Sequence, residues 1–242
     1  MPDNTQASIE RHIVNVIYES FALPADHDYL MARLLAQKGL TRGFYWAAAQ
    51  AVEKYLKAFL LMHGVGVDTK EFIGHPLVKL WNAASKINNT LKNLDITPHE
   101  SMHVEPSSAI HLKKYTINDF LDVLEKYGSP GNRYNAFGIK YNTGHLCALD
   151  SFCAKLRPKI GVIPIEESFK NLSPDLVHSF EHYNPWFASK DSQALSEIPN
   201  KDFPIKYGIS FTHLDFLIKN GSSNECGLAL QWLRSKMKLP KK

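Results

Sequence analysis

Arg133 and Tyr134 are adjacent side chains that together could bind a phosphate and an aromatic base. They follow the turn-forming run Gly-Ser-Pro-Gly at residues 128–131, so we expect them at the boundary of a helix. In one interpretation, the guanidinium of Arg133 contacts a phosphate, and Tyr134 stacks on a base or hydrogen-bonds to it. In the other, Arg133 pairs with a nearby carboxylate and Tyr134 belongs to the hydrophobic core.

A second group of polar side chains recurs at steps of three and four residues, the spacing of one helix face. Its members are Gln50, Glu53, Lys54 and Lys57. Such a face either lines a binding groove or is an ordinary solvated surface. In both cases Glu53 and Lys57 have the spacing of a stabilising ion pair within the helix.

Residues 99–103 have the pattern His-Glu-x-x-His that occurs in zinc hydrolases. That chemistry requires both histidines on one face of a sustained helix and a third ligand further along the chain. Pro98 and Pro106 leave room for about two turns of helix. His111 and Glu125 are available as third ligands, but no pattern marks either of them. We therefore expect neither a metal site nor a cofactor.

Helices must position these side chains, because apolar residues recur at three- and four-residue steps along most of the chain. The clearest pattern covers about residues 40–63, which is long enough for the central helix of a bundle. Its alanines, at positions 47, 48, 49 and 51, leave a narrow surface that another helix can approach closely. Further helices are predicted at about residues 8–21, 26–38, 75–87, 116–127, 143–156, 176–183, 211–219 and 225–238.

Local signals predict where some of these elements begin and end. Pro24 is expected to end the first helix, and Asp26 is expected to cap the second. Thr116 and Asp119 form a pattern like a capping box at the start of a later helix. Residues 162–166 form one short candidate strand.

The predicted fold class is all-α: an antiparallel up-and-down bundle of about four to five helices, with a helical C-terminal extension. We assign residues 1–25 to a peripheral helix, residues 26–158 to the bundle and residues 159–242 to the extension. Prolines divide the extension into short pieces, yet its large apolar side chains require burial. We therefore expect the extension to pack on the bundle, with a weak second domain as the alternative. Those side chains are Trp186, Phe187, Phe203, Tyr207, Phe211 and Trp232.

The composition is that of an ordinary globular protein, with 44% hydrophobic and 21% charged residues in 242. A net charge of +4 permits contact with nucleic acid but does not by itself argue for it. Three cysteines without CxxC spacing speak against a disulfide framework and favour a reducing cytoplasm. No apolar segment reaches the roughly 20 residues that a membrane-spanning helix needs, so we expect no membrane contact.

Three blocks of sequence resemble one protein family, in the order in which that family has them. Residues 50–64 read QAVEKYLKAFLLMHG, residues 74–77 read GHPL and residues 133–134 read RY. Together they resemble HEPN, the helical nucleotide-binding domains of higher eukaryotes and prokaryotes, over roughly residues 26–157. The resemblance implies a helical bundle that forms a homodimer around a cationic cleft.

Many HEPN proteins are metal-independent ribonucleases that use an arginine followed four to six residues later by a histidine. In this chain no histidine falls in that window after Arg133, and His145 lies further along. RNA cleavage needs one group to accept the 2′-hydroxyl proton and another to protonate the leaving oxygen. An arginine does not titrate near neutral pH, so Arg133 would need a displaced partner such as His145.

The resemblance therefore favours a non-catalytic nucleotide- or RNA-binding subunit. Such HEPN proteins accompany a minimal nucleotidyltransferase in two-component or toxin–antitoxin type systems. In this chain the ligand-binding residues would be Arg133, Tyr134, Lys54, Lys57 and Gln50, and the expected partner protein is a nucleotidyltransferase. Two alternatives stay open: a metal-independent ribonuclease with a degenerate motif, and a structural module that binds another protein.

Overall fold

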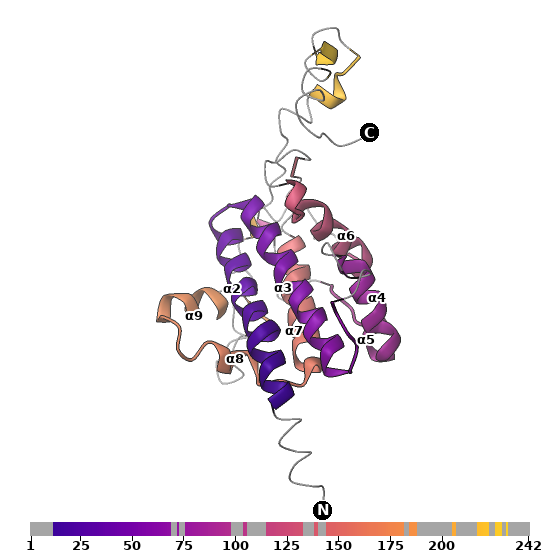
Figure 1. Ribbon diagram of the computed structural model, residues 1–242. Coiled ribbons are helices and arrows are strands. Elements are labelled where there is room, and N and C mark those ends of the chain that lie inside the picture. The colour runs from indigo at the N-terminus through magenta and orange to yellow at the C-terminus, as the bar shows by residue number, and fades with distance from the viewer. Residues whose placement is uncertain are drawn as a thin grey trace, which may run out of the picture.

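The protein is an all-α helical bundle built around one long helix, α3 (Thr41–Met62), as the computed structural model shows (Figure 1). The structure describes residues 12–68, 72, 76–97, 104–105, 115–132, 138–139, 144–181, 184–187, 205–206, 217–222, 226–228 and 231. The predicted all-α class is confirmed. Four further helices surround α3: α2 (Leu23–Gln37), α4 (Leu77–Ile87), α6 (Ile117–Tyr127) and α7 (Gly144–Leu156).

Helix α3 is buried along most of its length because apolar residues occupy nearly all of its circumference. Its observed bounds differ by one residue at each end from the predicted range of about 40–63. The four alanines of the predicted narrow surface are all buried. Gly128, just after α6, packs against this surface so closely that a Cβ atom built on it would lie 2.6 Å from Ala49 Cβ.

The N-terminal segment corrects two predictions. Residues 12–17 are helical and continue through a π-helix (Tyr18–Ala22) into α2, so Pro24 does not end the first helix. Pro24 lacks an N–H group but is tolerated in the first turn of α2, where an N–H group needs no partner within the helix. The backbone N–H of Leu23, just before it, donates to Tyr18 O and closes the π turn. Asp26 does not cap a helix either, because its carboxylate is buried and binds side chains from other elements.

Other helix ends follow the local signals. Thr116 caps α6: its Oγ1 accepts from the Asp119 N–H at 3.1 Å and donates to the Asp119 carboxylate at 2.8 Å. Asn88 caps the short helix α5 (Asn89–Lys92): its side chain accepts a hydrogen bond from the Thr90 N–H. The predicted strand at residues 162–166 is wrong, because α8 (Ile165–Ser168) begins directly after Pro164, a favourable position before a helix.

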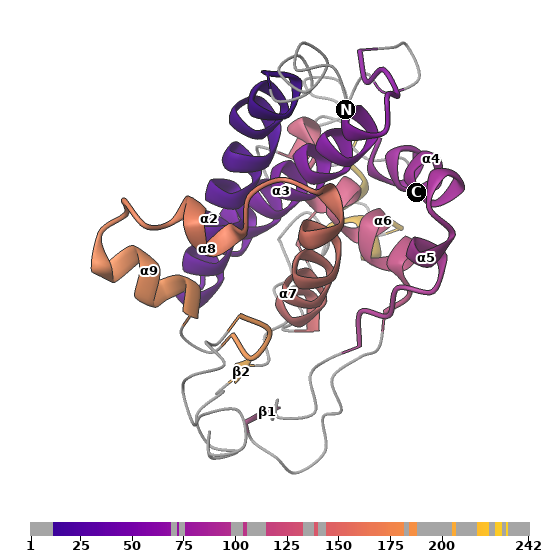
Figure 2. The same ribbon diagram turned by 90° about the horizontal axis from the view of Figure 1, so that it is seen from below.

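A 3-10 turn (Arg157–Ile160) follows α7 and contacts α3. Helices α8 and α9 (Pro174–Glu181) of the C-terminal extension lie on the α2 side of the bundle, away from α4 and α6 (Figure 2). Aromatic packing holds them there: the ring centroids of Phe180 and Phe187 lie 6.1 Å and 5.8 Å from that of Tyr29 on α2. Two short strands, β1 (Val104–Glu105) between α5 and α6 and β2 (Ile205–Lys206) after α9, pair in parallel.

The three cysteines, Cys147, Cys153 and Cys226, are free. In the described part of the chain, no helix is both long enough and apolar enough to cross a membrane. The His-Glu-x-x-His pattern at residues 99–103 lies outside the described residues.

Candidate functional site

A hollow of about 410 Å³ lies across the first half of α3, between α2 and the turn that follows α6. Helix α3 forms its floor and part of its rim. On one side stand residues of α2, and on the other side stand the end of α6 and a 3-10 turn (Pro130–Asn132). The lining residues are Asp28, Met31, Leu35, Arg42, Gly43, Trp46, Ala47, Tyr127, Ser129 and Asn132.

The hollow exists because two small residues follow each other one turn apart on α3. Gly43 and Ala47 present almost no side chain to the space between the neighbouring elements. The fit is tight on the α2 side, where a Cβ atom built on Gly43 would lie 3.1 Å from Leu35 Cδ1. A larger residue at position 43 or 47 would fill the cavity or separate α2 from α3.

The lining combines apolar surface with a few polar groups, which is the composition of a small-molecule site. Trp46 and Met31 are 40% and 49% exposed, so a molecule in the hollow can reach both. Arg42 and Asp28 add one positive and one negative group. The hollow can therefore receive a flat aromatic ring with an anionic substituent.

Of the predicted ligand-binding residues, the structure describes Gln50, Lys54 and Lys57, and none of these three lines the hollow. Gln50 and Lys54 follow Trp46 at steps of four residues, so the three side chains share one side of α3. Lys54 forms an ion pair with Asp28 of α2, and Lys57 pairs with Glu53 at 2.7 Å, as its spacing predicts. Each of these two lysines thus already has a carboxylate partner, and Gln50 is half-buried.

Arg133 and Tyr134 lie outside the described residues. The described part of the turn ends at Asn132, which lines the hollow and is the residue directly before Arg133 in the chain.

His145, the other catalytic candidate, is a core residue near the start of α7. His145 is only 4% exposed. Its Nδ1 atom forms a hydrogen bond of 2.6 Å with the hydroxyl of Tyr45. The rings of Tyr45 and Tyr115 pack on it at 5.6 Å and 4.8 Å between centroids. A histidine enclosed in this way supports the packing of α3 on α7 and does not reach an RNA backbone.

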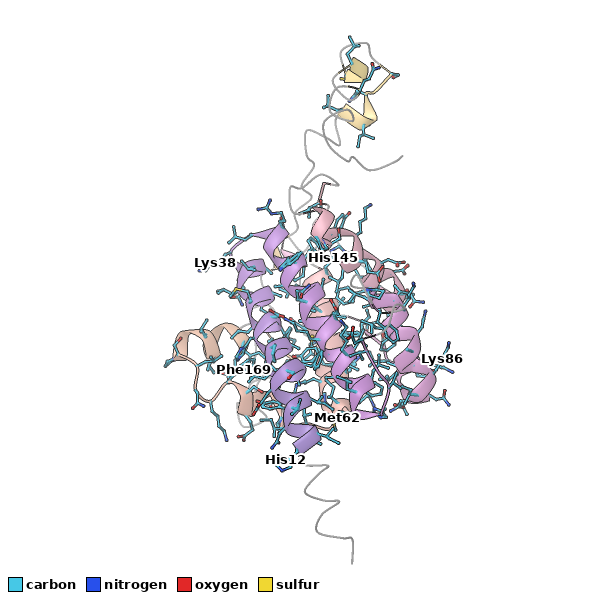
Figure 3. All side chains as sticks on the ribbon, viewed as in Figure 1. His12, Lys38, Met62, Lys86, His145 and Phe169 are labelled. Carbon is cyan, nitrogen blue, oxygen red and sulfur yellow. The ribbon has the colours of Figure 1, made fainter. Side chains whose placement is uncertain are left out.

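His145 and the α2–α3 turn nevertheless lie toward the same end of the bundle, which Figure 3 shows by the labels of His145 and Lys38. The connection runs through aromatic rings: Tyr127 lines the hollow, and its ring lies 5.0 Å from that of Tyr45, the partner of His145. This aromatic layer forms the inner wall behind the hollow and holds it open.

Beneath α2, a buried charge network ties that helix to α7. Arg33 pairs with Asp150, and the hydroxyl of Tyr29 donates to Asp150 at 2.6 Å. Asn184 from the C-terminal extension donates in turn to the Tyr29 hydroxyl at 3.0 Å. Burial raises the pKa of Asp150, and the nearby Arg33 only partly offsets this effect. Because these groups are sealed from solvent and mutually paired, we assign them a structural role.

Sequence reasoning identified none of the ten lining residues as a site residue, and this includes Arg42, Trp46 and Asp28. The available signal was an apolar side chain on an otherwise polar stripe of α3: Trp46 stands between Arg42 and Gln50 at steps of four residues. No protein-family model, no curated protein and no solved structure matches this chain.

Proposed function

We propose that this chain is a nucleotide- or RNA-binding, HEPN-like protein that serves as the non-catalytic subunit of a two-component nucleotidyltransferase or toxin–antitoxin type system. The observation that carries the proposal is the hollow across α3, with Arg42 and Trp46 in its lining and Asn132, the residue before Arg133, on its far side. The resemblance of residues 50–64 to the HEPN pattern supports the same function.

The chemistry of the lining suits such a ligand. Arginine guanidinium groups bind phosphate oxygens through paired, charge-assisted hydrogen bonds. An exposed indole is a stacking surface for a base, and base–aromatic stacking contributes about 1–3 kcal/mol per base. Arg42 and Trp46 are one helical turn apart on α3, so a base stacked on Trp46 places its phosphate within reach of Arg42.

The enclosed position of His145 supports the non-catalytic form of the proposal over the ribonuclease alternative. Incubation of the protein with mixed RNA, with and without a chelator, tests this choice. We expect the RNA to stay intact. Cleavage that Arg133→Ala abolishes would replace the proposal with a ribonuclease.

Binding is tested by calorimetric titration of ATP and of a short single-stranded RNA into the wild type. Arg42→Ala and Arg133→Ala should each weaken binding by about tenfold or more, because each removes a hydrogen bond to a charged group. Lys86→Ala is the matched control, since Lys86 is an exposed cation on α4, on the opposite side of the bundle (Figure 3). Failure of the wild type to bind either ligand would reject the proposal.

The proposal includes a homodimer. Leu40, between α2 and α3, is 58% exposed, and Met31 on α2 and Trp46 on α3 are 49% and 40% exposed. A second chain that covers such side chains would remove apolar surface from water. Light scattering should give the mass of two chains for the wild type and of one chain for Leu40→Glu. A wild type that is monomeric at high concentration would remove the dimer from the proposal.

A further inference from the structure

Asp28 is the acidic side chain in the lining of the hollow, and its presence is unexpected in a site for a polyanion. A carboxylate repels phosphate and only accepts hydrogen bonds when ionised. It therefore restricts which part of a nucleotide can lie next to it. Asp28 therefore helps to identify which nucleotide base the hollow can bind.

Both oxygens of the Asp28 carboxylate can accept a hydrogen bond from a ligand, because each carries two lone pairs. Within the described part of the chain, the hydrogen-bond partner of Asp28 is Lys54, which binds Oδ2. The ion pair holds the carboxylate between α2 and α3 and leaves acceptor capacity on Oδ1 and Oδ2 for a molecule in the hollow. Asp28 is half-buried, so a ligand hydrogen bond to it is less weakened by water than one on an open surface.

Asp28 and Arg42 lie at opposite ends of the hollow. Helices α2 and α3 pack side by side in opposite directions, with Asp28 beside Lys54 and Leu35 beside Gly43. The seven residues from Asp28 to Leu35 span about 10 Å along α2. A nucleotide whose phosphate binds Arg42 therefore directs its base, and not its phosphate, toward Asp28.

The four bases differ in what they present to a carboxylate. The Watson–Crick edge of guanine carries two adjacent N–H donors, N1–H and the N2 amino group, which match the acceptor-only carboxylate. Adenine and cytosine each place an acceptor nitrogen beside their amino donor. Uracil places one donor between two carbonyl oxygens. Guanine alone offers adjacent donors without an acceptor facing the carboxylate.

We propose that the hollow binds the base of a guanine nucleotide, with the Watson–Crick edge on Asp28, the ring on Trp46 and the phosphate on Arg42. This inference rests on the proposed nucleotide-binding function and adds the identity of the base. The hollow, at about 410 Å³, has the volume of a small-molecule site and holds one unpaired nucleotide. The guanine belongs either to a free nucleotide or to single-stranded RNA.

The test compares GMP, AMP, CMP and UMP, which carry the same phosphate, in calorimetric titrations against the wild-type chain. GMP should bind about tenfold more tightly than the other three, the discrimination expected of a good paired contact to a base edge. Asp28→Asn keeps the shape of the side chain but replaces an acceptor with a donor, and it should remove the preference for GMP. Binding of AMP should be unchanged or stronger.

Lys86→Gln is the matched control, because it removes a lysine charge from α4 outside the hollow, and it should keep the preference for GMP. Asp28→Ser provides a second variant if Asp28→Asn does not fold, as judged by circular dichroism. An oligouridine with a single guanosine distinguishes the source: tighter binding than GMP assigns the site to RNA, and equal binding assigns it to the free nucleotide.

Two failures are distinguishable. If the wild type binds none of the nucleotides and no RNA, the proposed function itself is rejected. If the wild type binds all four nucleotides equally, or if both Asp28 variants keep the preference for GMP, nucleotide binding stands and the guanine assignment is overturned.

Discussion

The guanidinium of Arg157 and the carboxylate of Asp26 meet in the protein core through two hydrogen bonds, from Nε to Oδ1 at 2.8 Å and from Nη2 to Oδ2 at 2.9 Å. The same carboxylate accepts from the hydroxyl of Tyr55 at 2.7 Å and from Ser168 at 2.6 Å. One buried side chain of α2 thereby binds α3, the 3-10 turn after α7, and α8. Asp26 connects the central helices with the C-terminal extension.

Removing Asp26 should be strongly destabilising. Asp26→Ala leaves the guanidinium of Arg157 buried without its partner, and breaking a buried ion pair in this way typically costs 3–5 kcal/mol (roughly) of unfolding free energy. Urea denaturation followed by circular dichroism measures the effect. The control is Lys170→Ala, which removes a surface pair with Glu167 at 2.5 Å and should cost about 0–1 kcal/mol. Equal costs for the two variants would contradict the role of Asp26.

Gly128 should not tolerate a side chain, although its backbone φ of −88° is ordinary. A Cβ atom there would lie 2.5 Å from Tyr45 O and 2.6 Å from Ala49 Cβ, so α6 and α3 would have to separate. We expect Gly128→Ala to lower the free energy of unfolding by about 1–3 kcal/mol. Gly66→Ala is the control, because no atom lies within 4 Å of its Cβ position, and it should change stability by less than about 0.5 kcal/mol. A thermal melt distinguishes the two outcomes.

The long helices could be predicted from the sequence because their signals are local. Apolar residues at three- and four-residue steps determine α3, and Thr116 with Asp119 determines the start of α6. Asp26 shows where local rules fail. Its position near a helix start predicts a cap, but Arg157, 131 residues away, binds its carboxylate in the core, and this tertiary contact outweighs the local preference.

The hollow could not be predicted, for the same reason. The sequence places Gln50 and Lys54 on one face of α3, but neither residue lines the hollow. Asp28 and Trp46 come together only because α2 and α3 fold back on each other, and no local pattern marks a contact between separate helices. The role of Arg133 stays a prediction, since it lies outside the described residues.

The cysteines should differ widely in reactivity. Burial raises the pKa of the Cys147 and Cys153 thiols well above the ordinary value, so both stay protonated near neutral pH and are enclosed by the core. Cys226 is half-buried. With a thiol-reactive dye at pH 8, we expect rapid labelling of Cys226 alone in the folded protein and labelling of all three cysteines in denaturant. Rapid labelling of Cys147 in the folded state would contradict the packing of α7.

The stability of the protein should fall at alkaline pH. Burial, followed by nearby carboxylates, raises the pKa of the Tyr29 and Tyr55 hydroxyls, and burial also raises that of the Cys147 and Cys153 thiols. In the unfolded chain these groups lose their protons near 9.0 for a thiol and 10.0 for a phenol, while in the folded chain they keep them. The unfolded state then binds fewer protons, so the free energy of unfolding decreases as pH rises through this range.

The urea midpoint should therefore be constant between pH 7 and 8 and should decrease between pH 9 and 11, because the contribution of a group with a raised pKa is complete below its unfolded value and is lost above it. Cys153→Ala removes one of the four groups and should make the decrease shallower, whatever its effect on stability at neutral pH. A midpoint that stays constant or rises up to pH 11 would mean that these side chains reach solvent in the folded protein, and it would contradict the sealed core between α2, α3 and α7.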